Sequence, residues 1–358
     1  MSFDRGKRRC GTALTALVGV CVATGASAGQ SVHDSTAARA PDRLFEATEP
    51  LELTLQADFG AINKNRGNDK PNHPGVLSYT TAARDSVALD VQLHTRGHFR
   101  LDRCQYPPLK IVFNREQTAH TTFAHQGSLK LAVQCRGGQS WGNYLLEEYL
   151  IYRAYNLLTD RSFHVRLARV TYVDPTGKHA PEVRRAFFVE DDDRMARRNA
   201  AHVFEQKGVF QTDVDFEQMG LAAVFQYMIG NTDFAVSALH NIVLIRDSVE
   251  VVYPVPYDFD WSGVIWTPYA QPDARLEIRD VRQRVFRGTC RSPQELATLF
   301  DRFNAQKDAI YELYRDMAAE GLEAKRIEQA LDYYDAFYKT INDPGRARRE
   351  FILACRRN

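Results

Sequence analysis

The sequence has almost no excess charge of either sign, because its 358 residues carry 46 basic side chains against 45 acidic ones. A near-neutral chain lacks the basic excess on which electrostatic nucleic-acid binding depends, so we expect no nucleic-acid partner. The sequence also lacks low-complexity blocks and internal repeats, and 44% of its residues are hydrophobic, which excludes a disordered chain or a collagen-like fibre. The chain is long enough to bury a sizeable core, in two domains or one large one.

The first 28 residues have the three-part pattern of a cleavable secretory signal: a basic start, an uncharged stretch at 10–25, and Ala26-Ser27-Ala28. The alternative is a transmembrane anchor, but the stretch lacks the ~20 strongly apolar residues of a span. Cys21 suggests a lipoprotein, yet Val20 precedes it where a lipid-attachment site has a small residue. We therefore expect an exported protein, periplasmic or secreted, with no transmembrane anchor and with a linker at residues 29–43.

Four cysteines follow the predicted signal, at positions 104, 135, 290 and 355. They have no C-x-x-C spacing, which argues against a zinc site. In an oxidising compartment they are expected to form disulfides, and four cysteines allow three pairings. Because Cys104 and Cys135 flank neighbouring strand-like runs and Cys290 and Cys355 bracket the C-terminal helical region, we favour those two pairs.

The order of the periodic segments predicts an α+β, two-lobed architecture, with a strand-rich part at 44–190 and a helix-rich part at 191–358. Helical spacing is found at 143–158, at 216–229 and in two or three segments after residue 292. A second hairpin is expected at 241–252. Strand-like runs in the first part lie at 51–55, 76–81, 87–95, 109–113, 129–133, 165–173 and 183–189, the last two joined by a turn.

Polar residues at 231–260 form the set that phosphoryl transfer requires. Asn231 and Asp233 follow a helix that ends at Gly230, and the expected hairpin returns the D-F-D at 258–260 to the neighbourhood of Asn241. A loop carboxylate can then accept a proton from an attacking hydroxyl, while an amide and a carboxylate pair hold magnesium. Each part alone has an ordinary structural interpretation as a cap or a solvated pair, so the order and spacing together carry the hypothesis.

This series, N-x-D, then Asn, then Y-P-x-x-Y-D-F-D, resembles the CotH kinase family, the spore-coat protein H type. The first half is similar too, with an R-G segment at 96–97 and a lysine-bearing strand at 108–113. The resemblance covers roughly residues 51–263 and implies an atypical protein-kinase-like fold. It also implies an exported kinase that transfers the ATP γ-phosphate, with Mg²⁺ or Mn²⁺, to a hydroxyl of a protein or envelope component whose identity is unknown.

The resemblance also implies roles for single residues. It makes Asp233 the catalytic carboxylate and Asn241 and Asp258 the metal ligands, with Asp260 as an auxiliary ligand. Lys110 would contact the nucleotide phosphates, and Arg96 with Gly97 would lie near them.

Lys130 is a rival for the role of Lys110, since it lies on the strand directly before the first helix, where an ordinary kinase carries its lysine. Glu147 or Glu148 on that helix would then pair with it.

Two other functions compete with the kinase. One is a catalytically inactive kinase-like module that binds an envelope glycan, peptide or partner, which the scarcity of ATP outside the cytoplasm would favour. The other is a hydrolase with Asp258 and Asp260 as acid and base, although carboxylates two residues apart on one strand are poorly placed to flank a glycosidic bond.

Overall fold

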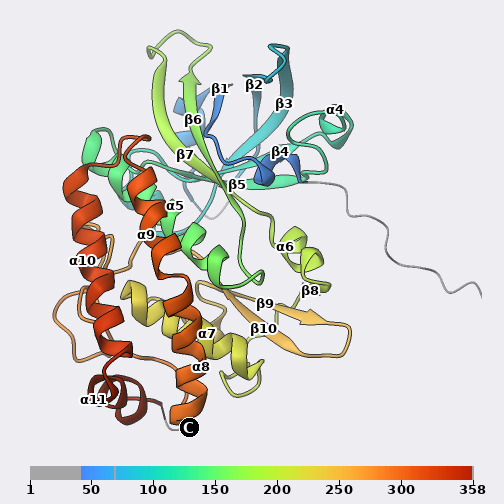
Figure 1. The fold of residues 1–358 in the computed structure, drawn as a ribbon. Coiled ribbons are helices and arrows are strands. Elements are labelled where there is room, and N and C mark those ends of the chain that lie inside the picture. The colour runs from blue at the N-terminus through green and yellow to red at the C-terminus, as the bar shows by residue number, and fades with distance from the viewer. Residues whose placement is uncertain (1–41, 68–69, 357–358) are drawn as a thin grey trace, which may run out of the picture. The chain divides into compact units, whose positions relative to one another are not determined.

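Seven strands of the first half close into a barrel in the computed structural model, which describes residues 42–67 and 70–356 (Figure 1). The order around the barrel is β1, β2, β3, β4, β5, β7, β6, and β6 returns to β1. Neighbours are antiparallel except β1 and β6, which pair in parallel with Leu51 opposite Ala168. The strands are β1 (Leu51–Ala57), β2 (His73–Thr80), β3 (Ser86–Thr95), β4 (Leu109–Phe113), β5 (Ser128–Val133), β6 (Val165–Val173) and β7 (Glu182–Val189).

The barrel corrects the predicted fold. The two-lobed, kinase-like arrangement with a helix-rich C-terminal lobe is wrong, because a closed mixed barrel, helices and a second small sheet take its place. The hairpin at 165–189 does form, but β6 also pairs with β1, more than a hundred residues earlier in the chain. Local periodicity carries no information about such a distant pairing. The predicted boundary after residue 190 stays a prediction.

Strand alternation places lysines on the outer face of the barrel. Along β4, Leu109, Ile111 and Phe113 are buried and belong to the barrel core, whereas Lys110 between them is half-buried. Because successive side chains of a strand point to opposite faces, Lys110 and its cross-strand partner Lys130 both project outward. This outward row becomes one side of the candidate site.

The second sheet consists of β10, β9 and β8, and β9 with β10 forms the predicted second hairpin. Its strands are β8 (Ala201–Val203), β9 (Ile242–Asp247) and β10 (Val252–Pro256). The longer helices are α5 (Gln139–Leu158), α7 (Phe216–Ile229), α8 (Pro293–Ala305), α9 (Lys307–Asp316) and α10 (Ala324–Ile341). The short ones are α1 (Arg43–Glu46), α2 (Phe59–Lys64), α3 (Phe99–Arg103), α4 (Arg115–Thr118), α6 (Asp192–Arg198), α11 (Pro344–Ala347), a 3₁₀ turn (Val236–Ala238) and a π-helical turn (Arg348–Leu353).

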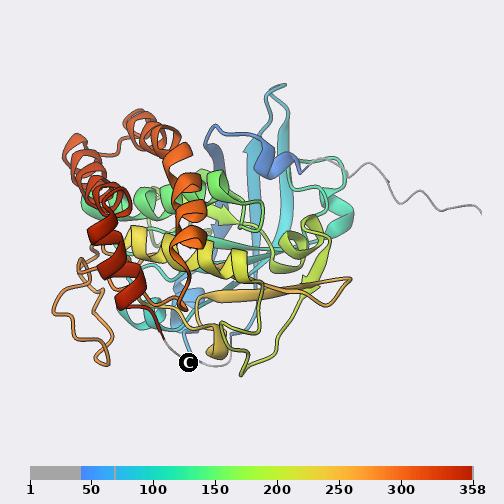
Figure 2. The same cartoon turned by 60° about the horizontal axis from the view of Figure 1, so that its bottom comes forward.

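Helix α5 connects the barrel to the C-terminal helices. It packs on β6 and β7 on one side and on α9 on the other, as Figures 1 and 2 show. It is therefore buried nearly all round, and even the adjacent carboxylates Glu147 and Glu148 are buried. A buried carboxylate is stable when a cation neutralises it, so Glu147 and Glu148 each require a cationic partner in the interior.

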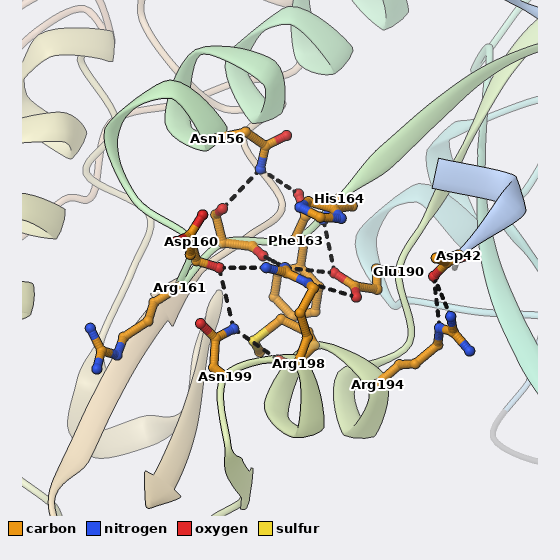
Figure 3. A network of polar contacts seen from close by, with 12 residues as sticks. Asp42, Asn156, Asp160, Arg161, Phe163, His164, Glu190, Arg194, Arg198 and Asn199 are labelled. Carbon is orange, nitrogen blue, oxygen red and sulfur yellow. Dashed lines mark hydrogen bonds and ion pairs between the residues drawn. The ribbon is translucent and has the colours of Figure 1, made fainter. Parts of the chain in front are cut away.

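A polar network fixes the end of α5 against β6, β7 and α6 (Figure 3). The buried Glu190 carboxylate accepts hydrogen bonds from the Arg198 guanidinium at 2.9 Å and from the backbone N–H of His164 at 3.1 Å. Asn156 donates to the carbonyl of Phe163 at 2.9 Å. The network satisfies polar groups that the junction buries, which is a structural role.

Two disulfides join Cys104 to Cys135 and Cys290 to Cys355, so both favoured pairings are confirmed. Disulfides persist in oxidising compartments, and they fit an exported protein. Among the described residues, every helix is too short or too polar to cross a membrane. The predicted signal at 1–28 and the linker as far as residue 41 lie outside the described residues.

Candidate functional site

The loop that carries Asp233 begins where α7 ends. Gly230 closes the helix in the left-handed conformation, with φ of 68°, and its N–H bonds back to the carbonyls of Gln226 and Tyr227. Glycine is the residue that adopts this conformation without steric cost. Asn231 follows, and its buried side chain accepts a hydrogen bond from the N–H of Asp233 at 2.9 Å. The turn therefore sets the direction of the Asp233 side chain.

Both oxygens of the Asp233 carboxylate have partners. Oδ1 lies 2.8 Å from Nε2 of His240, and Oδ2 accepts a hydrogen bond from Nδ2 of Asn241 at 3.0 Å. The hydrogen bond to Asp233 raises the pKa of His240. No described residue donates to Oδ1 of Asn241, so this oxygen stays available as a ligand. A partly exposed carboxylate held in one orientation by an imidazole and an amide is a suitable proton acceptor.

A second carboxylate group lies where β10 ends. Glu148 of α5, Asp258 and Asp260 each place one oxygen so that the three lie within 4.8 Å of one another. The guanidinium of Arg100 from α3 contacts all of them, at 2.8 Å from Glu148, 2.9 Å from Asp260 and 3.6 Å from Asp258. We call these four residues the acidic cluster. Glu148 and Asp260 are buried, whereas the Asp258 side chain is 40% exposed and faces the solvent side of the cluster.

Burial dominates the electrostatics of the acidic cluster. It raises the pKa of Glu148 to about 8 and also raises the pKa of Asp260. Burial would lower the pKa of Arg100, but the carboxylates of Asp260 and Glu148 outweigh it and hold that pKa well above its usual value. When all three carboxylates are ionised, above the raised pKa of Glu148, they leave a formal charge of −3 + 1 = −2 against the one guanidinium. An all-oxygen donor set with this net negative charge fits Mg²⁺ or Mn²⁺.

The two groups meet at the same end of the β9–β10 hairpin. The N–H of Tyr257 donates to the carbonyl of Asn241 at 3.1 Å, which places Asp258 beside the His240–Asn241 segment. The charge of Asp258 contributes to the raised pKa of His240. Asn241 and Asp258 both have a positive φ, of 52° and 60°. Such backbone conformations are sparsely populated in non-glycine residues and concentrate at functional sites.

Cationic side chains lie near the acidic cluster, on the side of the outer face of the barrel. Nζ of Lys130 lies 2.6 Å from the Asp192 carboxylate and 5.1 Å from the ring centre of Tyr257, the residue before Asp258. Burial lowers the pKa of Lys130. The half-buried Arg96 interacts electrostatically with Lys130 and with Tyr257, and no described carboxylate lies within ion-pair distance of it. Arg96 and Lys130 are therefore two cations close to the residue before Asp258, and Lys130 forms an ion pair with Asp192.

The remaining predicted residues lie at different distances from this centre. Lys110 is opposite Lys130 on the neighbouring strand, one position further around the barrel. Gly97 has a φ of 79°, and its carbonyl accepts a hydrogen bond from Lys70 at 2.8 Å. Glu147 is buried against Arg326 of α10, so it faces the C-terminal helices.

The structure thus pairs the helix glutamates differently from the sequence hypothesis. Glu148 binds Arg100 and Glu147 binds Arg326, while Lys130 pairs with Asp192. Sequence reasoning missed Arg100, His240 and Asp192 as members of the site. For His240 the signal was present, since it lies between Asp233 and Asn241 in the same short segment.

A scan of the chain against protein-family models finds no match, and a search of the curated proteins finds none. The resemblance to the CotH kinase family stays a prediction.

Proposed function

We propose that the chain is an exported phosphotransferase that moves the γ-phosphate of ATP to a hydroxyl of a protein or envelope component. One observation carries the proposal: an oriented carboxylate, an acidic cluster with more carboxylates than cations, and two further cations meet at one end of the β9–β10 hairpin. Phosphoryl transfer depends mainly on positioning and on electrostatic stabilisation, and these groups supply both. The barrel is a different scaffold from that of a kinase, so the proposal is argued from the site and not from the fold.

In the proposed reaction Asp233 accepts the proton of the attacking hydroxyl. The hydroxyl oxygen forms a bond to the γ-phosphorus while the bond from that phosphorus to the ADP oxygen breaks. His240 and Asn241 hold the carboxylate in the orientation for this transfer. Asp258, Asp260 and Asn241 would hold Mg²⁺ or Mn²⁺, which when bound neutralises phosphate charge.

Lys130 and Arg96 are the groups that we expect to bind the donor phosphates. Lys130 lies over Tyr257 and is held by Asp192, so its ammonium group is oriented before a ligand binds. Arg96 has no described carboxylate partner and is free to contact phosphate oxygens in a bidentate manner. Lys110 lies on the adjacent strand and would extend the same cationic row.

One observation favours the alternative, a catalytically inactive binding module. Arg100 already contacts all three carboxylates of the acidic cluster, and it supplies in part the positive charge that a metal ion would bring. In that case the cluster would be a structural element, and the cationic row would recognise an anionic envelope ligand.

The test compares the mature protein, which lacks the predicted signal at residues 1–28, with its variant Asp258→Asn. The substitution keeps the size of the side chain. We expect the wild type to bind ATP in the presence of Mg²⁺ or Mn²⁺ and to label itself or an acceptor with γ-phosphate. Losing one electrostatic contact to the reacting group should reduce transfer on the order of 100-fold in the variant. Asp301→Asn on the exposed face of α8 is the matched control and should transfer normally. A folded wild type that binds no nucleotide would refute the phosphotransferase and favour the binding module.

A further inference from the structure

A cleft of about 300 Å³ adjoins the acidic cluster and takes no part in the chemistry above. Aromatic and cationic side chains from three segments line it, namely Phe99, Arg103, Arg136, Trp141 and Tyr269. Phe99 and Arg103 belong to α3, and Trp141 lies in the first turn of α5. The disulfide between Cys104 and Cys135 ties two of these segments together, directly beside Arg103 and Arg136.

The aromatic rings in this cleft have cationic and aromatic neighbours. The guanidinium of Arg103 lies 5.8 Å from the ring centre of Phe99, and that of Arg136 lies 5.3 Å from that of Trp141. Trp141 also stacks on Tyr269, with ring centres 6.0 Å apart and planes 15° apart. A sugar ring that binds by stacking needs a free aromatic face, and Trp141 already has Arg136 and Tyr269 beside its ring, so it is a poor platform for a sugar.

The guanidinium edges remain available. Arg103 and Arg136 are both exposed, and within the described part of the chain neither has a carboxylate at ion-pair distance. Arg136 donates only to the carbonyl of Arg103, at 3.3 Å. The planar fork of N–H groups on a guanidinium matches the two oxygens of a carboxylate. The cleft therefore offers two carboxylate-binding edges on an apolar floor.

We infer that this cleft docks an acidic segment of polypeptide. Trp, Tyr and Arg are the residues that dominate the energy of protein interfaces, and carboxylate side chains complement the two exposed guanidinium groups. The hydroxyl of Tyr269 donates to Asp260 at 2.9 Å, and Phe99 directly precedes Arg100. A peptide in the cleft consequently lies beside the acidic cluster. Its identification as the phosphate acceptor rests on the proposed function, whereas the docking itself does not.

The test measures binding of a fluorescein-labelled peptide of alternating glutamate and serine to the mature protein by fluorescence anisotropy. The matching lysine and serine peptide and an oligogalacturonate of equal charge are the comparison probes. We expect the acidic peptide to bind, the basic peptide not to bind, and the oligogalacturonate to bind at least several-fold more weakly.

The double variant Arg103→Gln/Arg136→Gln should weaken binding of the acidic peptide about tenfold. The matched control is Arg315→Gln/Arg346→Gln, which removes the same charge from exposed positions on α9 and α11 and should bind like the wild type. Equal binding by both double variants, preferential binding of the oligogalacturonate, or no binding of the acidic peptide would each overturn the inference. Asp258→Asn separates the two proposals, because it should reduce transfer on the order of 100-fold and leave peptide binding intact.

Discussion

Replacing Arg100 by glutamine tests the electrostatic account of the acidic cluster most directly. The Arg100 side chain is only 11% exposed, and its strongest partners, Glu148 and Asp260, are 5% and 9% exposed. The variant leaves two buried carboxylates and Asp258 without their cation. Removing one partner of a buried ion pair costs about 3–5 kcal/mol, because the remaining charge is uncompensated.

The cost should depend on pH, with a sign that follows from the pKa shifts. Burial already raises the pKa of Glu148 to about 8 and raises that of Asp260 in the wild type. Without Arg100 both values rise further, so the folded variant holds protons that its unfolded chain releases. The wild type shares this loss of stability with rising pH up to its own folded pKa values, so the difference between the two proteins is smallest near the unfolded carboxyl pKa of about 4 and grows as the pH rises through and above the wild-type values. We expect a difference from the wild type of about 1–2 kcal/mol near pH 4, from lost hydrogen bonds alone.

Urea unfolding of wild type and variant at acidic and at slightly alkaline pH measures this difference. Arg284→Gln is the matched control, since Arg284 is half-buried and its side chain donates, among the described residues, to backbone carbonyls alone, those of Tyr227, Met228 and Tyr333. The control should lose stability by the same amount at both pH values. A loss in Arg100→Gln that is below about 1 kcal/mol, or that does not grow with pH, would refute the reasoning.

Two further expectations concern the loop that carries Asp233. The pKa of His240, measured by NMR, should lie above ~6.5 and should fall toward that value in Asp233→Asn. The stability that this hydrogen bond contributes should be present below pH ~6.5 and lost as the pH rises through the raised pKa. An unchanged pKa in the variant would contradict the pairing. Gly230→Ala should destabilise the fold by about 2–4 kcal/mol, because the residue has a positive φ and an added Cβ would overlap the hydroxyl of Tyr333. Gly137→Ala is the control, because an added Cβ there would have no atom within 4 Å. Similar losses of stability in both variants, measured by thermal denaturation, would argue against the clash.

The elements that the sequence predicted correctly are those determined by local pattern. Helix α7 was expected at 216–229 and has those bounds, and the hairpin of β6 and β7 has its turn where D-P-T-G predicted one. Both disulfides follow from the placement of cysteines beside elements that were themselves predicted. The barrel was missed because its closing contact, β1 with β6, depends on the twist and stagger of all seven strands.

The candidate site likewise contains residues that local pattern predicted and residues that it did not. Asp233, Asn241 and Asp258 lie on one short stretch of chain, so a predicted hairpin was enough to bring them together. Arg100 lies 160 residues before Asp260 and on a short helix without a recognisable motif. Its contact with the carboxylates depends on how α3 packs against α5, which no local pattern contains.

The position of Arg100 is also what separates the two candidate functions. If a divalent cation binds the acidic cluster, its charge and that of Arg100 compete for the same oxygens, and the cation should bind more tightly to Arg100→Gln than to the wild type. If the cluster is a structural ion-pair network, Mg²⁺ should stabilise neither protein. Thermal denaturation of both proteins with and without Mg²⁺ distinguishes these cases, since a ligand that binds only the folded state raises its stability. A stabilising effect of Mg²⁺ that is larger in the variant supports a metal site, and its absence in both favours the binding module.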